Sequence, residues 1–147
     1  MPRIQTTYAE TMDEGRAGMI VNTELKNLIS RNVEGADGIG FGKAVARGTL
    51  DRSARVTTTG DTKILGISVR ERSVDANDED NIAEGRELRV MTKGVTYVTV
   101  SGAVVQGEAV HLAVATGVWS NAGGITVANA EFETSAADGE LARVRLS

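Results

Sequence analysis

The stretch of the sequence that looks most like a chemical site is a glycine-rich segment ending in a lysine. Gly38, Gly40 and Gly42 alternate with apolar residues and precede Lys43, a pattern that superficially resembles a phosphate-cradling loop. The spacing of a P-loop is absent, however, and no Ser or Thr follows the lysine to bind magnesium. No helical pattern follows that would offer its N-terminus to an anion. The segment instead predicts a single β-strand over residues 38–48, whose glycines let another backbone approach closely.

A polar stretch, residues 73–85, places acidic side chains at alternating positions, as the first ligands of a calcium loop would be. Asp75 and Glu79 fit that spacing. Asp80 stands where the calcium loop requires glycine, and Arg86 stands where it requires a bidentate glutamate. The stretch therefore predicts a solvated surface loop.

Side chains that could perform catalysis are few. His111 is the only histidine and cysteine is absent, which excludes multi-histidine metal sites and thiol catalysis. Neighbouring carboxylates such as Asp13 and Glu14 lie in polar stretches, where both stay ionised. Acid–base catalysis needs two pKa values that are pushed apart. We therefore predict no enzyme activity, no catalytic residue, no metal site and no cofactor, and we expect His111 to be a half-exposed strand residue.

Trp119 is the single tryptophan of the chain. An indole can stack on a sugar or a base. At the end of a strand, however, it more commonly anchors a core or an interface.

The amino-acid composition argues against nucleic acid and membranes as partners. The 147 residues carry a formal net charge of −4, and the few basic residues are scattered, so no phosphate-binding surface is expected. No apolar run approaches the roughly 18–20 residues of a membrane span, and no signal segment opens the chain. These features predict a protein made in the cytoplasm that binds neither nucleic acid nor membrane.

The elements that must position these side chains are short strands punctuated by glycine. Residues 88–119 contain three β-rich runs, and 95–100 (VTYVTV) is dense enough in β-branched residues to fit a pleated, mostly buried surface. We expect further strands at 63–70, 130–135 and 140–146, the last two joined through Asp138-Gly139. The sum predicts a mainly β fold, either a compact β-barrel or a jelly-roll-like sandwich.

The first 37 residues differ from the remainder because they show no sustained periodicity. We interpret residues 1–37 as an extended N-terminal arm, with a short strand around 28–33, and residues 38–147 as a single β domain. A terminus packed on its own domain is the alternative.

Several phrases, in this order, resemble the bacteriophage structural cement or capsid decoration proteins, a family of small phage head proteins. They are GMIVN (18–22), SRNVEGADGIGFGKAVARG (30–48), ILGISVRE (64–71), VMTKGVTYVTVSGAVVQGEAVHLAVATG (90–117) and AEFETSAADGELARVRL (130–146).

The resemblance implies a non-enzymatic virion protein with a mainly β body and an extended terminal arm. It implies binding on the outer surface of the phage head, as a homodimer or homotrimer, at junctions between subunits of the major capsid protein. There the protein would brace the shell against the pressure of packaged DNA.

Contact residues are predicted by position alone, mostly in the arm. The predicted contacts with the capsid or with other copies are Ile4, Tyr8, Met19, Ile20, Val21 and Trp119. Deleting residues 1–20 is expected to leave the body folded and to abolish capsid binding.

Three alternative functions stay open at this point. A tail or baseplate module would have the same composition. A small all-β trimeric nucleotide hydrolase would need phosphate and magnesium motifs that are missing here. A carbohydrate-binding module would need more than the five aromatic residues present.

Overall fold

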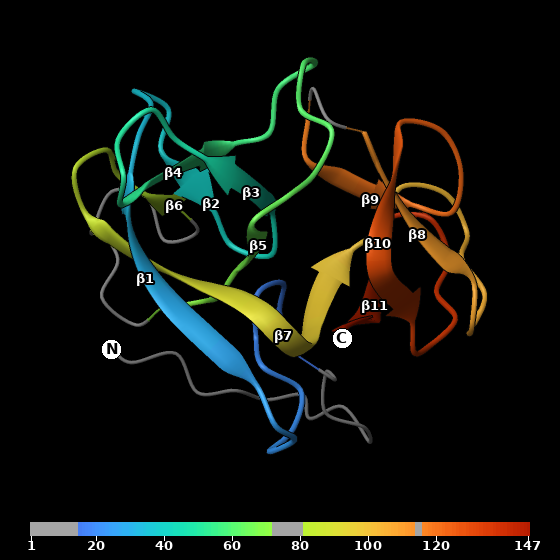
Figure 1. The fold of residues 1–147 in the computed structure, drawn as a ribbon. Coiled ribbons are helices and arrows are strands. Elements are labelled where there is room, and N and C mark those ends of the chain that lie inside the picture. Colours follow the sequence, from blue (N-terminus) through green and yellow to red (C-terminus); the bar gives the residue numbers. More distant parts are fainter. Residues whose placement is uncertain (1–14, 72–80, 114–115) are drawn as a thin grey trace, which may run out of the picture.

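The computed structural model describes residues 15–71, 81–113 and 116–147, and these contain no helix (Figure 1). The chain is therefore mainly β, as predicted. Its strands, in chain order, are β1 (Asn27–Val33), β2 (Ile39–Gly40), β3 (Ala44–Arg47), β4 (Ser53–Val56), β5 (Gly66–Ser68), β6 (Asn81–Ile82), β7 (Glu87–Thr99), β8 (Ala109–Ala113), β9 (Val118–Ser120), β10 (Ile125–Phe132) and β11 (Leu141–Leu146).

The first half of the molecule is a closed barrel. Its strands follow the order β1-β4-β3-β5-β7, and β1 also pairs with β7, so the sheet returns to its starting strand. All these pairs are antiparallel except β1 with β4, which is parallel. Each barrel strand is therefore paired with two neighbours, which confirms the barrel alternative of the predicted fold.

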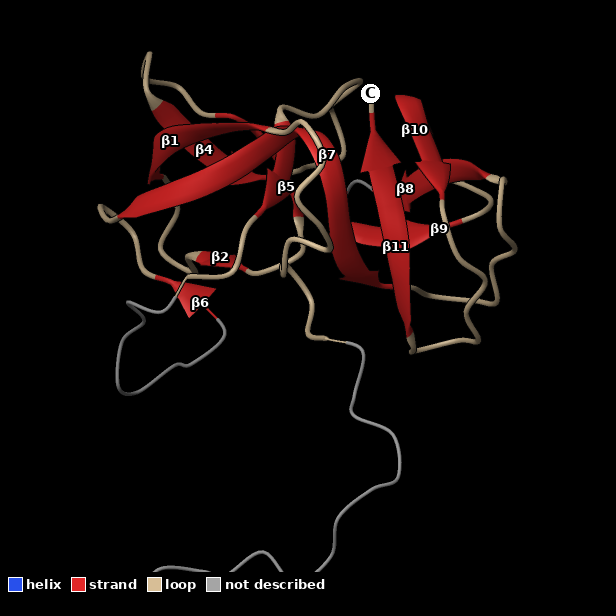
Figure 2. Cartoon of the chain, turned by 90° about the horizontal axis from the view of Figure 1, so that it is seen from below, coloured by secondary structure: helices blue, strands red, loops and turns tan. Residues whose placement is uncertain are grey.

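The second half is a curled sheet built on the other end of β7. Its strands follow the order β7-β11-β10-β8-β9, and every neighbouring pair is antiparallel. A parallel bridge between Val100 and Trp119 then brings β9 back to the end of β7. Figure 2 shows the two groups of strands side by side, with β7 passing between them.

Strand β7 belongs to both halves because it bends at a glycine. Residues up to Lys93 pair with β1, whereas Gly94 and the residues after it pair with β11. Gly94 has φ 131°, and a Cβ there would lie 2.9 Å from the Cβ of Lys26 and 3.0 Å from the Sδ of Met91. A side chain is therefore excluded at the bend by both the backbone conformation and the space available.

Each half has its own apolar core. The smaller core fills the barrel and consists of Val33, Ile39, Phe41, Val45, Ala54, Ile82, Leu88 and Val90. The larger core fills the second half and extends to the outside of the barrel; it consists of Ala44, Ile67, Val98, Val100, Val104, Val110, Leu112, Trp119, Val127, Phe132, Ala142, Val144 and Leu146.

Trp119 joins the two halves. Its side chain is buried in the larger core, and its Nε1 donates a hydrogen bond to the carbonyl oxygen of Gly42, at 2.8 Å. Ala44 and Ile67 extend the same core from β3 and β5 of the barrel. The halves are thus held together by apolar packing around one satisfied indole as well as by β7.

The predicted single strand over residues 38–48 is wrong. Residues Ile39–Gly40 form β2, which pairs with β6, and Ala44–Arg47 form β3 in the barrel. The chain turns between them at Gly42, which has φ 70°. Ser68 stabilises the turn, because its Oγ donates to the carbonyl of Gly40 (2.5 Å) and accepts from the amide of Lys43 (3.0 Å).

Other predicted strands agree better with the structure. The strand expected at 63–70 is shorter, since β5 spans Gly66–Ser68. The strand expected at 130–135 begins and ends earlier, since β10 spans Ile125–Phe132, but it pairs with β11 as expected, and Gly139 between them has φ 79°. In β11 the buried residues are Ala142, Val144 and Leu146, and the alternate residues are half-buried.

The predicted arm falls into three parts. Residues 1–14 lie outside the described residues, residues 15–26 run over the body, and the strand expected around 28–33 is β1, which pairs with β7 and β4. A division of the chain into arm and body at residue 37 stays a prediction.

Candidate functional site

Within the described residues, no three or more His, Cys, Asp or Glu side chains are grouped so that they could hold a metal ion. His111 is half-buried, as expected, and its Nδ1 lies 3.1 Å from the carbonyl oxygen of Gly123, in the connection between β9 and β10. The acidic residues at 75–80 lie outside the described residues.

No helix in the described part of the chain has the length and apolar character needed to cross a membrane.

Residues 15–26, which we call the arm root, are bonded to the second part of β7 like an additional strand. The amide of Gly18 donates to the carbonyl of Tyr97 (2.8 Å), and the amide of Tyr97 donates to the carbonyl of Met19 (3.0 Å). The amide of Val21 donates to the carbonyl of Val95 (3.1 Å), and Ile20 forms an antiparallel bridge with Thr96. The point at which residues 1–14 join the body is thus fixed by backbone hydrogen bonds.

Two glycines allow the arm root to approach the barrel closely. A Cβ on Gly18 would lie 2.9 Å from the amide nitrogen of Gly42, and one on Gly42 would lie 2.8 Å from that of Gly18. Arg70 bonds to the same part of the arm root. Its backbone amide donates to the carbonyl of Gly18 (2.8 Å), and its Nε donates to the carbonyl of Ala17 (3.1 Å). The close backbone approach predicted from the glycines of 38–48 is thereby confirmed at Gly42.

Charged side chains fasten the far end of the arm root to the last strand. Arg145 of β11 forms an ion pair with Glu24, at 2.6 Å, and a second one with Glu133. The hydrogen bond from Arg145 holds the pKa of Glu24 below its usual range, and its two carboxylate partners raise the pKa of Arg145. Glu24 therefore stays ionised at neutral pH, and the clamp that Arg145 forms is electrostatic as well as geometric.

The ring of Tyr97 supports the beginning of the arm root. The guanidinium of Arg143 lies over this ring, 5.5 Å from its centroid, which is within cation–π range. Gly15 lies against the ring edge, since a Cβ there would be 2.8 Å from the ring. Tyr97 and Arg143 are cross-strand neighbours on β7 and β11, so the pairing of these strands positions the ring and the guanidinium against each other.

The structure brings together only some of the predicted contact residues. Met19 is 40% exposed, and Ile20 and Val21 are half-buried beside it on the arm root. Trp119 is 1% exposed and belongs to the core. Ile4 and Tyr8 lie outside the described residues. Of the two alternatives for Trp119, core or interface anchor, this chain by itself shows the core.

Three exposed apolar residues were not among the predicted contacts. Leu25 is 88% exposed at the turn of the arm root, Leu50 is 73% exposed at the β3–β4 turn, and Val105 is 57% exposed before β8. The sequence signal that could have found them is a lone apolar residue within a polar turn, such as Leu50 in GTLDR (48–52), but such residues are common on any surface.

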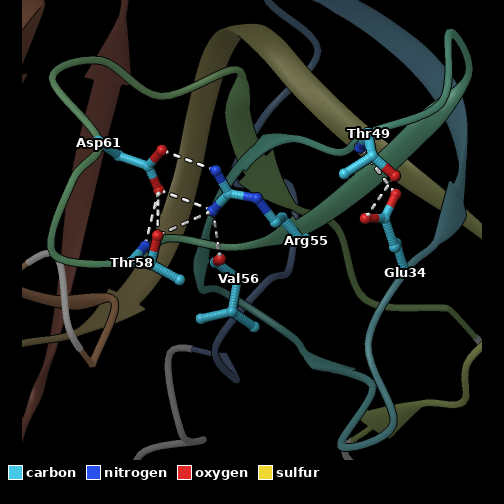
Figure 3. Close-up of polar contacts among 6 residues, drawn as sticks. All are labelled: Glu34, Thr49, Arg55, Val56, Thr58 and Asp61. Atoms are coloured by element: carbon cyan, nitrogen blue, oxygen red, sulfur yellow. Dashed lines mark hydrogen bonds and ion pairs between the residues drawn. The ribbon is translucent and has the colours of Figure 1, made fainter.

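At the far end of the barrel, a carboxylate fixes the β3–β4 turn (Figure 3). Glu34 accepts hydrogen bonds from the amide of Thr49 (2.8 Å), the hydroxyl of Thr49 (3.0 Å) and the hydroxyl of Ser53 (2.5 Å). These bonds, led by that of Ser53, lower the pKa of Glu34. The turn that carries Leu50 is therefore tied to the residue that follows β1.

A second polar group fixes the neighbouring loop, residues 57–61 (Figure 3). Arg55 donates two hydrogen bonds of 2.8 Å to the carboxylate of Asp61, and the amide of Thr58 donates to the same carboxylate at 2.6 Å. The arginine, more than the amide, lowers the pKa of Asp61 to about 2. The loops that precede and follow β4 are thus both held by charge-assisted hydrogen bonds.

Solved structures with a similar fold are components of phage heads. A chain of the capsid of Myoviridae phage XM1 matches with a TM-score of 0.78 at 17% identity, over 100% of this chain and 98% of that one. The N base of head fiber gp8.5 of bacteriophage phi29 matches with a TM-score of 0.55 at 12% identity, over 84% of this chain and 95% of that one. At these identities the likeness establishes the fold. No curated protein sequence matches the chain.

The sequence model of one family, described as structural cement protein (E217 gp24/Pam3 gp6), matches residues 4–147. That range includes the arm root, both halves of the body and all eleven strands. The resemblance stated from the sequence phrases is thereby confirmed. The chain belongs to the phage structural cement protein family, and its role is that of a structural protein of the virion.

Proposed function

We propose that this protein binds the outer surface of a phage head, at junctions between subunits of the major capsid protein. There it braces the shell against the pressure of packaged DNA, without enzymatic activity. The observation that carries the proposal is the family match over residues 4–147. The formal net charge of −4 supports a position outside the shell, because an acidic surface is not attracted to DNA.

A brace must transmit force without deforming, and the body supports that task. The two halves share the 13-residue strand β7 and are packed together around Trp119. The arm root is bonded along β7 at the same junction. Tension on the arm is therefore delivered to the most extensively paired strand of the molecule.

Affinity for the shell comes from several modest contacts made at once. Linking weak contacts raises the effective concentration of each, so a tight brace does not require one strong interface. We place these contacts on the arm, including Ile4 and Tyr8, and on the exposed Met19 of the arm root. Ile20 and Val21 contribute through the strand that they form.

The finer features of the proposal follow from the same role. The protein assembles as a homodimer or homotrimer, binds neither nucleic acid nor membrane, is made in the host cytoplasm and ends on the outer surface of the head. Low aromatic content supports assembly, because docking supplies burial that few rings can supply within one chain.

The test is co-sedimentation of the purified protein with empty shells of the cognate major capsid protein, with light scattering on the free protein. We expect saturable binding at a fixed ratio and a defined dimer or trimer. A protein that stays in the supernatant at every concentration would contradict the proposed function.

The contribution of the arm is tested by a shorter deletion than the sequence alone suggested. Removing residues 1–14 retains the arm root on β7, so the folded body is preserved. We expect this variant to lose shell binding while its melting temperature stays unchanged. A Val105→Ser variant, altered on the second half, serves as the control that keeps binding; full binding by the deletion variant would contradict the arm model.

A further inference from the structure

A notch opens at the edge of the barrel where two neighbouring strands diverge. Strand β3 continues through Ala46 and Arg47, while residues 60–65, which lead into β5, turn away from it. The hollow between them has a volume of about 410 Å³. A second hollow of about 220 Å³ lies on the other side of Thr62–Ile64, against residues 125–128 of β10. The notch is thus an opening beside a strand, not a gap within a core.

The backbone of β3 presents unpaired groups to this notch. The amide of Gly48 donates to the carbonyl of Ser53 on β4 (3.0 Å), and the amide of Leu65 donates to the carbonyl of Val45 (2.7 Å). Because backbone groups alternate in direction along a strand, even-numbered residues of β3 face β4 and odd-numbered ones face β5. Arg47 is in register with Ala54 of β4, but its N–H and C=O point away from β4 into the notch, beyond the last residue of β3 that pairs with β5.

The opposite wall of the notch is unpaired as well. Among the described residues, no hydrogen bond is made by the backbone amides of Thr62, Lys63 and Ile64. An extended peptide placed between the two walls could therefore bond to backbone on both sides, as in recognition by strand addition. Unpaired strand edges are the usual templates for such additions.

The charges around the notch select an acidic peptide. Arg47 and Lys63 are exposed, and neither forms an ion pair with any described residue. Asp61, the acidic residue on the wall, is already neutralised by two hydrogen bonds from Arg55, as Figure 3 shows. The notch is consequently a site of net positive charge on a protein that is acidic overall.

The sequence contains a segment with the matching chemistry. Residues 8–14 (YAETMDE) hold Glu10, Asp13 and Glu14 and no basic residue. The sole proline is Pro2, so every residue of 3–14 keeps the N–H that a strand ladder needs. Residue 14 is bonded directly to Gly15 of the arm root, so a strand of the seven residues 8–14 extends at most about 23–25 Å from the root. The arm root, however, lies on the opposite side of the molecule from loop 57–65 (Figure 1), so the notch of a neighbouring copy is the better-placed receptor.

We propose that the notch between Arg47 and Lys63 accepts residues 8–14 of a second copy as an added β-strand. This inference rests on the proposed arm function and specifies its receptor: copies are linked to one another by their arms. The capsid subunit and the notch of the same chain are the competing destinations, and the experiments below separate them.

The first experiment locates the arm directly in the full-length protein. A photoreactive phenylalanine derivative replaces Tyr8, and ¹⁵N-labelled and unlabelled chains are mixed before irradiation. We expect cross-linked peptides that join residue 8 to the segments 44–47 or 60–65 and that pair one labelled with one unlabelled chain. Cross-links that occur only within one chain, or that miss both segments, would overturn the inference.

The second experiment uses charge reversal with rescue. The variant Arg47→Glu/Lys63→Glu should self-associate more weakly by roughly fivefold per reversed charge, as measured by sedimentation. Mixing it with a variant that carries Glu10→Lys and Glu14→Lys should restore association. Reversal at Lys26 and Lys93, away from the notch, is the matched control. Self-association that is unchanged by reversal of both notch charges, or that the mixture does not restore, would overturn the inference.

Shell binding is measured in parallel, so the two proposals fail separately. Wild-type protein that binds shells while residue 8 cross-links to the capsid subunit alone would retain the proposed function and overturn the notch as receptor. Wild-type protein that shows notch cross-links but no shell binding would retain the notch as the receptor of the arm and contradict the proposed function.

Discussion

The barrel and the second half of this molecule are both made of short strands, yet they are held together differently. The barrel core contains eight buried residues with one aromatic ring, Phe41, whereas the larger core contains thirteen, including Trp119 and Phe132. The barrel compensates with polar bonds in the loops before and after β4, where Glu34 accepts from Thr49 and Asp61 accepts from Arg55. Apolar packing thus dominates one half, and closure plus charge-assisted bonding supports the other.

This difference predicts which kind of change should destabilise each half. Truncating a large side chain acts on the half that depends on packing, because the cavity that remains costs additional free energy. Acid acts on the half that depends on ionised carboxylates, since protonation removes their hydrogen bonds to the loops. Because strand β7 belongs to both halves, destabilising one half also affects the other.

The largest effect is expected from Trp119→Ala. It removes the side chain that joins the two halves and the hydrogen bond to Gly42, so the free energy of unfolding should fall by about 3–5 kcal/mol. Chemical denaturation measures the loss, with the exposed Leu25→Ala as control. A loss as small as that of the control would mean that the halves do not depend on this packing.

A smaller effect is expected at the bend of β7. Gly94→Ala forces a side chain into positive φ and against Lys26 and Met91, which should cost about 1–3 kcal/mol. Gly102→Ala is the matched control, because Gly102 also has positive φ (84°) but its Cβ would meet no atom within 4 Å. Equal losses in both variants would show that the close approach at Gly94 contributes nothing.

Acid should distinguish the two halves. The folded-state pKa of Asp61 is about 2, below its ordinary value of 3.8, so its stabilisation is complete above pH 4 and is lost as pH falls toward 2. Hydrogen exchange should show loop 57–61 and β4 losing protection in that range before β8 and β10. In Asp61→Asn the early loss should disappear, because the variant lacks the ion pair at every pH; simultaneous loss in both halves of the wild type would contradict the comparison.

The smallest effect is expected at the arm root. Arg145→Gln releases Glu24 and Glu133 at the surface, so the melting temperature should change little. The amides of Gly18 and Val21, which bond to β7, should nevertheless exchange faster with solvent. Unchanged exchange at these amides would show that the backbone pairing holds the root without the ion pairs.

Local pattern predicted much of the fold. The β-branched run at 95–100 is buried on both faces except for Thr99, and the alternation of apolar and charged residues in β11 set its inner face. The Asp138-Gly139 turn likewise identified the last hairpin. Each of these features depends on residues close together in the chain, where periodicity and turn chemistry are informative.

The remainder depended on contacts between distant residues. The division of 38–48 into two strands follows from bonds to Ser68, and the barrel closes through pairing of β1 with β7, sixty residues apart. The clamp at Arg145 joins Glu24 to the last strand across 121 positions. No local pattern records such partners, so the arm root and its fastening were not predictable from one sequence.

The position of β11 has a consequence for how the chain is made. The last strand of the sequence lies between β7 and β10 in the middle of the sheet, so neither of those strands can acquire its full set of neighbours until residue 146 has left the ribosome. The barrel, by contrast, has all its strands once residue 93 is available. Translation that stops early therefore yields a chain with an unfinished half and exposed edges, which proteases and chaperones recognise. A stop codon after Gly139 should give a product that is degraded rapidly in cells, and the arrangement thereby restricts assembly to chains translated through β11.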